Sequence, residues 1–426
     1  MNSNCNSDHI DFAGSNLFNE MELLEQVDEE KDRHPLVDMN YLYKGFRSSM
    51  KGSSWKSEPQ KFESDFLHQL NLLRKDMLNR EYTTSEGSEF ILNERGHIRY
   101  IHGEIMRDRT IRHVFCDYIL KDALSKYLIY NNGASQKGKG IRFSRDLFER
   151  DLHNYYLEYG TNDGYIVFVD FSKFYDNILH EKVKEMMNPL LDNLSQFMLS
   201  EALKNFEVDM SHLSNEDFER CLYEKFNSIE YHERTYGMKK TGEKMMPKSA
   251  NIGDQVSQDI GVSFPTRVDN YVKIVLSVKR YGRYMDDMYA ICRTKEEAKQ
   301  IIDGINTCAI ELGLFVNMKK THIAKLSDKY TFLQIKYTLT DTGKVVKRIN
   351  PKTVTRERRK LKAYKRLLNK GVITFEDVEQ AYKSWMGTFA KLMSKKQVKN
   401  MKKLCVDLFG VDIRWKPEPK YKKQHN

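Results

Sequence analysis

A pair of adjacent carboxylates between two short apolar runs constrains this chain most. Residues 281–291 read Tyr-Gly-Arg-Tyr-Met-Asp-Asp-Met-Tyr-Ala-Ile, which sets Asp286 and Asp287 between runs rich in aromatic and apolar residues. This pattern predicts two strands joined by a tight turn, with both acids at its tip. An Asp-Asp pair alone is also typical of a solvated turn. It becomes a metal site only where another carboxylate approaches from a neighbouring strand.

A third acid follows a separate apolar segment. Residues 164–170 read Gly-Tyr-Ile-Val-Phe-Val-Asp, and the unbroken apolar run predicts a strand buried on both faces. Such a strand delivers its last side chain, Asp170, to the rim of the sheet. Carboxylate oxygens suit Mg²⁺, and two such ions roughly 3.5–4 Å apart can support phosphoryl transfer. We therefore predict that Asp170 and Asp286 bridge two Mg²⁺ ions with support from Asp287, and that Mn²⁺ can substitute.

Several segments, in order along the chain, resemble the motifs of reverse transcriptases. Asp170-Phe-Ser-Lys-Phe-Tyr-Asp176 is similar to the first catalytic motif, and Ile252-Gly-Asp-Gln-Val-Ser-Gln258 is similar to the next. Residues 312–321 resemble the lysine-bearing segment that follows the acidic hairpin. The resemblance spans about residues 95–387 and points to compact bacterial enzymes related to retron, diversity-generating, abortive-infection and defence-associated reverse transcriptases. It implies an α+β right-hand polymerase with fingers, a palm of antiparallel sheet plus helices, and a helical thumb.

The resemblance also implies roles for single residues. Phe171 would join the three acids in binding metal, and Lys320 would act as a catalytic residue near the triphosphate. Tyr175 would lie under the sugar of the incoming nucleotide and exclude a 2′-hydroxyl, so deoxynucleotides are the expected substrates. The full set expected to bind the nucleotide is Arg99, Arg109, Tyr175 and Gly253.

Two positions depart from the family pattern. Ile252 stands where many relatives have Gln, although diversity-generating and abortive-infection relatives also carry an apolar residue there. Phe332-Leu333-Gln334 resembles the primer-grip hairpin, in which Gly is more frequent at the position of Gln334.

Basic segments predict contacts with nucleic acid. The loop Gln136-Lys-Gly-Lys-Gly140 resembles a Gly-rich finger loop of the bacterial enzymes. Residues 344–370 contain twelve lysines and arginines and a single acid, and apolar residues recur at helical spacing over 353–368. One helix face can then pack while another lies along phosphates, although such a run is also typical of a solvated face. The expected contacts are Lys137, Lys139, Arg142, Ser257, Arg356, Arg359, Lys360 and Trp385, of which Trp385 is also suited to core packing.

Bulk properties agree with a polyanionic partner. The 426 residues carry a formal net charge of +10 and a pI of about 9.0. No apolar stretch approaches the roughly 20 residues that span a bilayer, and the first residues lack a secretory pattern, so we expect a cytoplasmic protein without membrane association.

Six cysteines without a C-x-x-C pair are expected to be free thiols.

The segments predict four parts. They are an acidic arm over 1–38, fingers over 39–164, a palm over 165–343 with a helical insertion at about 184–250, and a basic helical thumb with a C-terminal tail over 344–426.

The expected activity is RNA-directed DNA synthesis, with dNTPs as substrates and DNA as the product. The resemblance implies a structured non-coding RNA as template and a role in defence against phage. Template-independent or protein-primed synthesis is an alternative within the enzyme class. A catalytically silent RNA-binding scaffold is the alternative from another class, and whether the chain forms homo-oligomers stays open.

Overall fold

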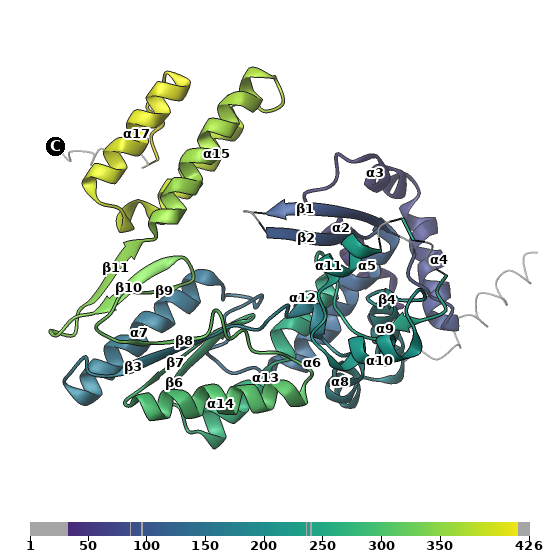
Figure 1. Cartoon of the computed structure of the whole chain (residues 1–426). Coiled ribbons are helices and arrows are strands. Elements are labelled where there is room, and N and C mark those ends of the chain that lie inside the picture. Colours follow the sequence, from purple (N-terminus) through teal and green to yellow (C-terminus); the bar gives the residue numbers. More distant parts are fainter. Residues whose placement is uncertain (1–32, 86, 95–96, 236, 239–240, 416–426) are drawn as a thin grey trace, which may run out of the picture. The chain divides into compact units, whose positions relative to one another are not determined.

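The computed structural model describes residues 33–85, 87–94, 97–235, 237–238 and 241–415 (Figure 1). Most of the predicted acidic arm and the C-terminal tail from residue 416 therefore lie outside the described residues. The chain forms two compact units, each assembled from segments distant in the sequence. The first unit comprises Met1–Tyr130, Phe171–Asn270 and Asn306–Val316, and the second comprises Asn131–Asp170, Tyr271–Ile305 and Asn317–Asn426.

The second unit is built around a four-stranded antiparallel sheet with the order β6-β7-β3-β8. Its strands are β3 (Tyr165–Val169), β6 (Arg280–Tyr284), β7 (Asp287–Cys292) and β8 (His322–Lys325). β6 and β7 form the predicted hairpin around the acidic pair. β3 pairs with a strand on each side, and four of its five residues are buried. Both strand predictions are thus confirmed.

A helix joins this sheet to a second, three-stranded sheet. Helix α7 (Ile141–Tyr159) packs with β9 (Tyr330–Phe332), β10 (Ile335–Leu339) and β11 (Val345–Ile349) in one buried cluster. The ring of Phe148 on α7 is fully buried, and its centroid lies 4.8 Å from those of Tyr289 and Tyr337 and 4.7 Å from that of Phe332. These contacts fix the helix and both sheets as one core, since aromatic pairs at such distances add to burial.

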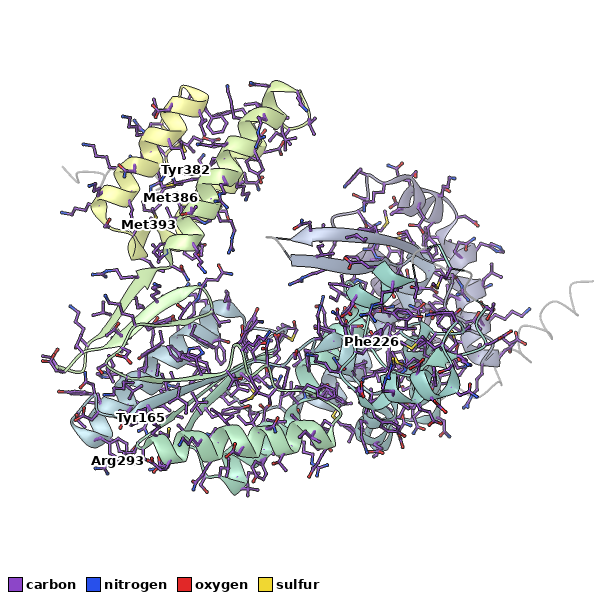
Figure 2. All side chains as sticks on the ribbon, viewed as in Figure 1. Tyr165, Phe226, Arg293, Tyr382, Met386 and Met393 are labelled. Atoms are coloured by element: carbon purple, nitrogen blue, oxygen red, sulfur yellow. The ribbon has the colours of Figure 1, made fainter. Side chains whose placement is uncertain are left out.

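Three C-terminal helices form a core of their own. They are α15 (Pro351–Asn369), α16 (Phe375–Phe389) and α17 (Lys395–Phe409). Asn350 caps α15 by accepting a hydrogen bond from the Lys352 N–H at 3.0 Å, and proline follows at the first helical position. Tyr382, Met386 and Met393 lie between α15 and α17 (Figure 2). The helix predicted over 353–368 is confirmed.

The first unit is mainly helical. Its helices are α2 (Met39–Ser49), α3 (Ser57–Ser64), α4 (Phe66–Asn79), α5 (Met106–Phe115), the π-helical η1 (Cys116–Leu120), α6 (Lys121–Ser125), the 3₁₀ turn η2 (Tyr175–Asn177), α8 (His180–Met187), η3 (Asn188–Leu190), α9 (Asn193–Lys204), α10 (Asn215–Tyr223), α11 (Ser228–Arg234), α12 (Gln255–Ser263) and α13 (Thr266–Asn270). Two antiparallel pairs complete it, β1 (Ser88–Glu94) with β2 (His97–Gly103), and β4 (Val208–Asp209) with β5 (Met245–Met246). η4 (Tyr271–Val275) opens a segment of the second unit, and α14 (Lys295–Glu311) spans the boundary at Ile305. Helices and antiparallel sheets together confirm the α+β class.

The expected free thiols are found wherever the structure covers a cysteine. Cys116, Cys221, Cys292, Cys308 and Cys405 form no disulfide, whereas Cys5 lies outside the described residues. Among the helices that the structure describes, none is long and apolar enough to cross a bilayer.

Candidate active site

Strand pairing brings the three acids to one end of the strands in the four-stranded sheet. We call this end, with Asp170, Asp286 and Asp287, the acidic edge. β3 and β7 are antiparallel with Val169 opposite Met288, so Asp170, which follows Val169, lies at the edge where Asp287 begins β7. Asp286 precedes it in the two-residue turn of the hairpin. The convergence expected from the sequence is therefore a direct consequence of the strand register.

The turn that carries the acids has an unusual backbone. Met285 has a φ of 55°, in the left-handed region that residues other than glycine seldom adopt. Buried Arg283 donates a hydrogen bond from Nη1 to the Met285 carbonyl at 3.0 Å, and its backbone pairs with Asn131 and Gly133 at 3.1 Å each. Arg283 was not among the predicted site residues, although its place three residues before Asp286, at the predicted turn, is visible in the sequence.

Asp170 is buried and has two polar neighbours. Lys320 Nζ lies 2.9 Å and 3.1 Å from its two carboxylate oxygens, and Asn317 Nδ2 lies 3.3 Å from one of them. The Asn317 N–H also donates to the Asp170 carbonyl at 2.7 Å. A buried carboxylate needs such partners, because an unpaired charge in the interior is costly. The structure thus places Lys320 at Asp170, and it adds Asn317, which the sequence analysis did not single out.

Charges at this edge influence one another. Desolvation, followed by the charges of Asp286 and Asp170, raises the pKa of Asp287 to about 7, whereas Lys320 lowers it. Because Asp287 is exposed to solvent, repulsion by the two neighbouring carboxylates is the main cause of its raised pKa. Partial burial would lower the pKa of Lys320, but its hydrogen bond to Asp170 and the surrounding acids raise it.

The carboxylates of Asp170, Asp286 and Asp287 have the chemistry to bind a divalent cation. They supply the oxygen ligands that Mg²⁺ prefers, and a cation would relieve the repulsion that raises the Asp287 pKa. Within the part of the chain that the structure describes, no three His, Cys, Asp or Glu side chains are grouped as metal ligands. Instead, the Lys320 ammonium contacts both oxygens of Asp170. The Phe171 ring is buried and stacks on Phe174 with centroids 5.6 Å apart, so only the main-chain carbonyl of Phe171 could reach a metal.

Gly253 and Ser257 lie at the start of α12 in the first unit. Gly253 has a φ of 116°, and a Cβ there would meet the His102 carbonyl oxygen and the Ile101 side chain at 3.3 Å. Gly253 therefore lets the chain pass close to β2, and its contact with a nucleotide stays a prediction. Ser257 does not cap this helix. Asp254 is the cap and accepts from the Val256 N–H at 2.6 Å, whereas Ser257 is buried inside the helix.

The two predicted arginines have different surroundings. Arg109 on α5 donates to the Ser49 carbonyl at 2.6 Å and to Ser53 Oγ at 3.3 Å, so its guanidinium holds the end of α2. Arg99 is exposed on β2, opposite Leu92. Contact of either residue with a nucleotide stays a prediction.

A buried arginine of the first unit escaped the sequence analysis. Arg112 forms ion pairs with Glu104 and with Asp254, the cap of α12, and all three side chains are almost fully buried. This cluster ties the loop before α5 to the start of the helix that carries Ser257. In the sequence Arg112 gives no distinct signal, because it follows Arg107 and Arg109 closely and basic residues are frequent in this chain.

The predicted nucleic-acid residues of the second unit are mostly accessible. Lys137, Arg142, Arg356, Arg359 and Lys360 are exposed. Lys139 is half-buried and donates to the Asn132 carbonyl at 3.1 Å. Trp385 is also half-buried and packs on the C-terminal core, with its ring 5.5 Å from that of Phe389. Core packing therefore accounts for part of its surface.

The turn between β9 and β10 explains a departure noted in the sequence. Leu333 and Gln334 have φ values of 43° and 73°, which glycine adopts without strain. Gln334 thus occupies a position whose backbone favours the Gly of the relatives. Arg145 Nε on α7 donates to the Leu333 carbonyl at 3.0 Å and helps to hold the turn.

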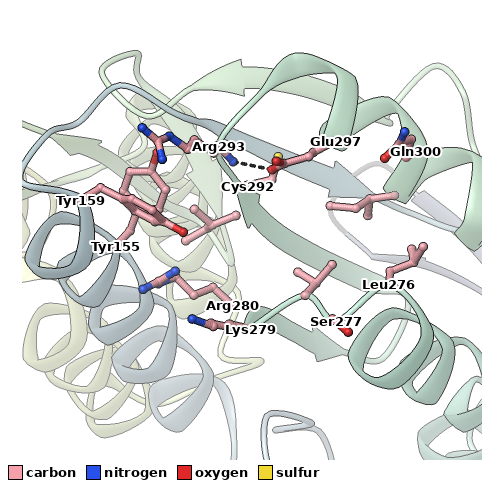
Figure 3. Close-up of a pocket in the computed structure, with 13 residues that line it drawn as sticks. Tyr155, Tyr159, Leu276, Ser277, Lys279, Arg280, Cys292, Arg293, Glu297 and Gln300 are labelled. Carbon is pink, nitrogen blue, oxygen red and sulfur yellow. Dashed lines mark hydrogen bonds between the residues drawn. The ribbon is translucent and has the colours of Figure 1, made fainter.

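A pocket of about 350 Å³ lies at the opposite end of these strands, where β6 begins and β7 ends (Figure 3). The Arg280 guanidinium lies over the rings of Tyr155 and Tyr159, 5.5 Å and 5.8 Å from their centroids, and pairs with Glu158. Its charge already has a partner, and none of the predicted site residues lines this pocket. We therefore regard the pocket as separate from the acidic edge.

One family model matches part of the chain. Residues 251–337 match the family model described as reverse transcriptase (RNA-dependent DNA polymerase). No curated protein matches the chain.

Two solved telomerase structures show loose similarity. Telomerase from Candida albicans in complex with a TWJ fragment of telomeric RNA matches with 14% identity and a TM-score of 0.40, over 77% of this chain and 59% of that chain. Apo telomerase from Candida tropicalis, truncated from its C-terminal domain, matches with 16% identity and a TM-score of 0.37, over 61% of this chain and 54% of that chain. This chain thus spans less than two thirds of either one. Both similarities are too loose to carry an argument.

Proposed function

We propose that this protein, in which the family match indicates an RNA-directed DNA polymerase, extends a primer with dNTPs at the edge formed by Asp170, Asp286 and Asp287. One observation supports this site above all. Two segments far apart in the chain bring their carboxylates to the same end of paired strands, and Lys320 contacts one of them. Such a cluster beside a polyanion would repel phosphate and has no use in a protein that only binds nucleic acid.

Divalent cations, Mg²⁺ or Mn²⁺, would be held by the three aspartates and the main-chain carbonyl of Phe171. When bound, two such ions activate the primer hydroxyl and neutralise the departing pyrophosphate. The resemblance to bacterial reverse transcriptases supports Mg²⁺ as the cation and two as the number of ions.

The side chains of this protein would supply the remaining functions. Lys320 would exchange its hydrogen bonds with Asp170 for hydrogen bonds with the triphosphate, where its ammonium can neutralise or protonate the leaving group. Tyr175 would limit the sugar to a deoxyribose. The exposed basic residues of α15 would hold the nucleic acid through its phosphates.

The test removes two charges from the hairpin. Asp286→Asn combined with Asp287→Asn keeps side-chain size but removes both carboxylates, so we expect at least a thousandfold loss of labelled dNTP incorporation on a primed RNA, on the order of other losses of electrostatic stabilisation. RNA affinity and thermal unfolding should change little. Undiminished synthesis by this variant would contradict the assignment.

A matched control removes the same charge elsewhere in the second unit. Asp328 and Asp341 are exposed loop acids, and the double variant Asp328→Asn with Asp341→Asn should retain its activity. If the control loses as much activity as the hairpin variant, net charge and not the acidic edge is responsible.

The template and the biological role rest on the resemblance alone. We propose a structured non-coding RNA as template, and defence against phage as the role, in a bacterial cell. Sequencing the nucleic acid that co-purifies with the protein would identify template, primer and product together. DNA that stays linked to the protein after denaturation would identify protein priming, and synthesis without added RNA would identify template independence. No incorporation on any template would instead favour the silent scaffold.

A further inference from the structure

Gly261 lies inside helix α12, where a glycine is unexpected on local grounds. Its φ is not in the left-handed region, so the backbone does not require it. A glycine in a helix interior is destabilising relative to alanine. A buried helical glycine that the backbone does not require usually has a packing reason.

The packing reason is a single neighbouring side chain. A Cβ added at Gly261 would stand 2.7 Å from the Tyr175 hydroxyl oxygen, 3.1 Å from its Cζ and 3.3 Å from its Cε1. These are the three nearest atoms, and all belong to Tyr175. Both residues lie in the first unit. The missing side chain of Gly261 therefore makes room for the Tyr175 phenol.

Tyr175 is fixed at its other end. Its carbonyl accepts a hydrogen bond from the Ala250 N–H at 2.9 Å, and the ring of Phe174 contacts it edge to face at 5.3 Å. The backbone anchor and the space at Gly261 together determine how far the ring extends from α12. Tyr175 is half-buried, so part of its surface is exposed to solvent. A side chain at position 261 would therefore displace the phenol from its place against α12.

We infer that Gly261 is a positioning residue that sets the depth of the Tyr175 ring and thereby tunes the fit of the nucleotide sugar. This inference rests on the proposed function, in which Tyr175 limits the sugar of the nucleotide to a deoxyribose. Gly261 touches no substrate itself. It acts through the tyrosine, because an alanine at this position would shift the ring from its place against α12.

The kinetic test compares two nucleotides that differ at the sugar. Gly261→Ala should raise the KM for a dNTP roughly ten- to hundredfold, as expected for a shift of about 1 Å near the reacting groups. An acyclic nucleoside triphosphate, which lacks the 2′ carbon, should be affected much less. A loss of packing in general would raise both KM values by the same factor, and that result would overturn the inference.

A double-mutant cycle tests the contact itself. Tyr175→Phe removes the oxygen atom that stands nearest to the added Cβ, so Gly261→Ala should lower the unfolding midpoint much less in the Tyr175→Phe background than in the wild type. Equal shifts in both backgrounds would overturn the inference without any use of activity.

Gly387 provides the control. It lies in helix α16, and a Cβ added there meets nothing within 4 Å. Gly387→Ala should leave the ratio of the two KM values unchanged. A wild-type protein that incorporates no dNTP at all would instead overturn the proposed function, and this inference with it.

Discussion

Asp170 and Lys320 show how a single contact connects folding with chemistry. Asp170 is buried and would be unfavourable as an isolated charge, and the lysine compensates for it while the protein is free of substrate. Because the side chain of Lys320 is largely exposed, it is free to move when a competing anion arrives. The same ammonium therefore serves stability in one state and, in the proposed reaction, the triphosphate in the other.

Replacing Lys320 tests this dual role. We expect Lys320→Ala to lower kcat for dNTP incorporation by roughly 10²- to 10⁴-fold, the usual contribution of a positioned acid–base group. Lys320→Arg, which keeps the charge, should recover part of the loss. The adjacent, exposed Lys319 is the control, and Lys319→Ala should behave like the wild type. Equal losses in the two alanine variants would show that only local charge matters.

A buried histidine makes stability depend on pH. His180 is 3% exposed, and its Nε2 lies 2.8 Å from the Ser249 carbonyl oxygen. Burial lowers its pKa to about 4 from an ordinary value of 6.5, although the bond to Ser249 opposes this. Because the unfolded chain takes up the proton first, stability is fully present above pH 6.5 and is lost as pH falls toward 4.

The expected loss can be measured by urea unfolding at pH 7 and pH 5. His180 should account for about 2 kcal/mol of the difference in unfolding free energy between these two pH values. In His180→Gln this part of the pH dependence should disappear. The exposed His153 serves as comparison, since His153→Gln should keep it. An unchanged pH dependence in His180→Gln would contradict the assignment.

At the scale of elements, helix α15 separates its two faces by residue type. Thr353, Glu357 and Leu361 recur every four residues and are buried, whereas Arg356, Arg359 and Lys360 are exposed. Spacing of this kind places one row against the C-terminal core and leaves the cations on another face.

The cations of α15 should determine how RNA binding responds to salt. Replacing Arg356, Arg359 and Lys360 by alanine should reduce the slope of log affinity against log salt by about 2 to 3, since each phosphate contact contributes roughly 0.7–0.9. The exposed lysines Lys295 and Lys299 of α14 offer a control pair, and their replacement by alanine should leave the slope unchanged. A triple variant with the slope of the wild type would show that α15 does not contact phosphates.

At the scale of the whole molecule, the chain passes between the two units five times. The boundaries fall after Tyr130, Asp170, Asn270, Ile305 and Val316. Each unit combines three segments of the chain. The predicted division into consecutive fingers, palm and thumb is a different kind of division and stays a prediction. Strand β3 illustrates the consequence, because both of its partners, β7 and β8, follow residue 270.

Splitting the chain after Asn270 should therefore expose β3. In the intact protein we expect slow hydrogen exchange at the amides of Ile166 to Val169, and in a fragment of residues 1–270 we expect fast exchange there. Helices α2 and α5, which pack on each other within one continuous segment, should stay protected in both. Protection of β3 in the fragment would contradict the prediction.

The sequence by itself determined strand β3, the hairpin of β6 and β7, the α15 helix and the identity of the acidic residues. Unbroken apolar runs, helical spacing and a pair of carboxylates at a turn are local signals that depend on neighbouring residues alone. Strand direction and pairing then follow with few alternatives, because buried strands must satisfy their hydrogen bonds. The convergence of Asp170 with Asp286 and Asp287 was foreseeable for this reason.

Only the tertiary structure decided which side chains support those acids and which do not face them. Arg283 holds the turn of the hairpin by a hydrogen bond to the Met285 carbonyl. Asn317 holds the carboxylate of Asp170, which is distant from it in the sequence. Ser257 is buried inside α12, and the Tyr175 phenol occupies the space beside Gly261. Such roles depend on which surfaces meet after folding, and no periodicity within a short segment encodes that.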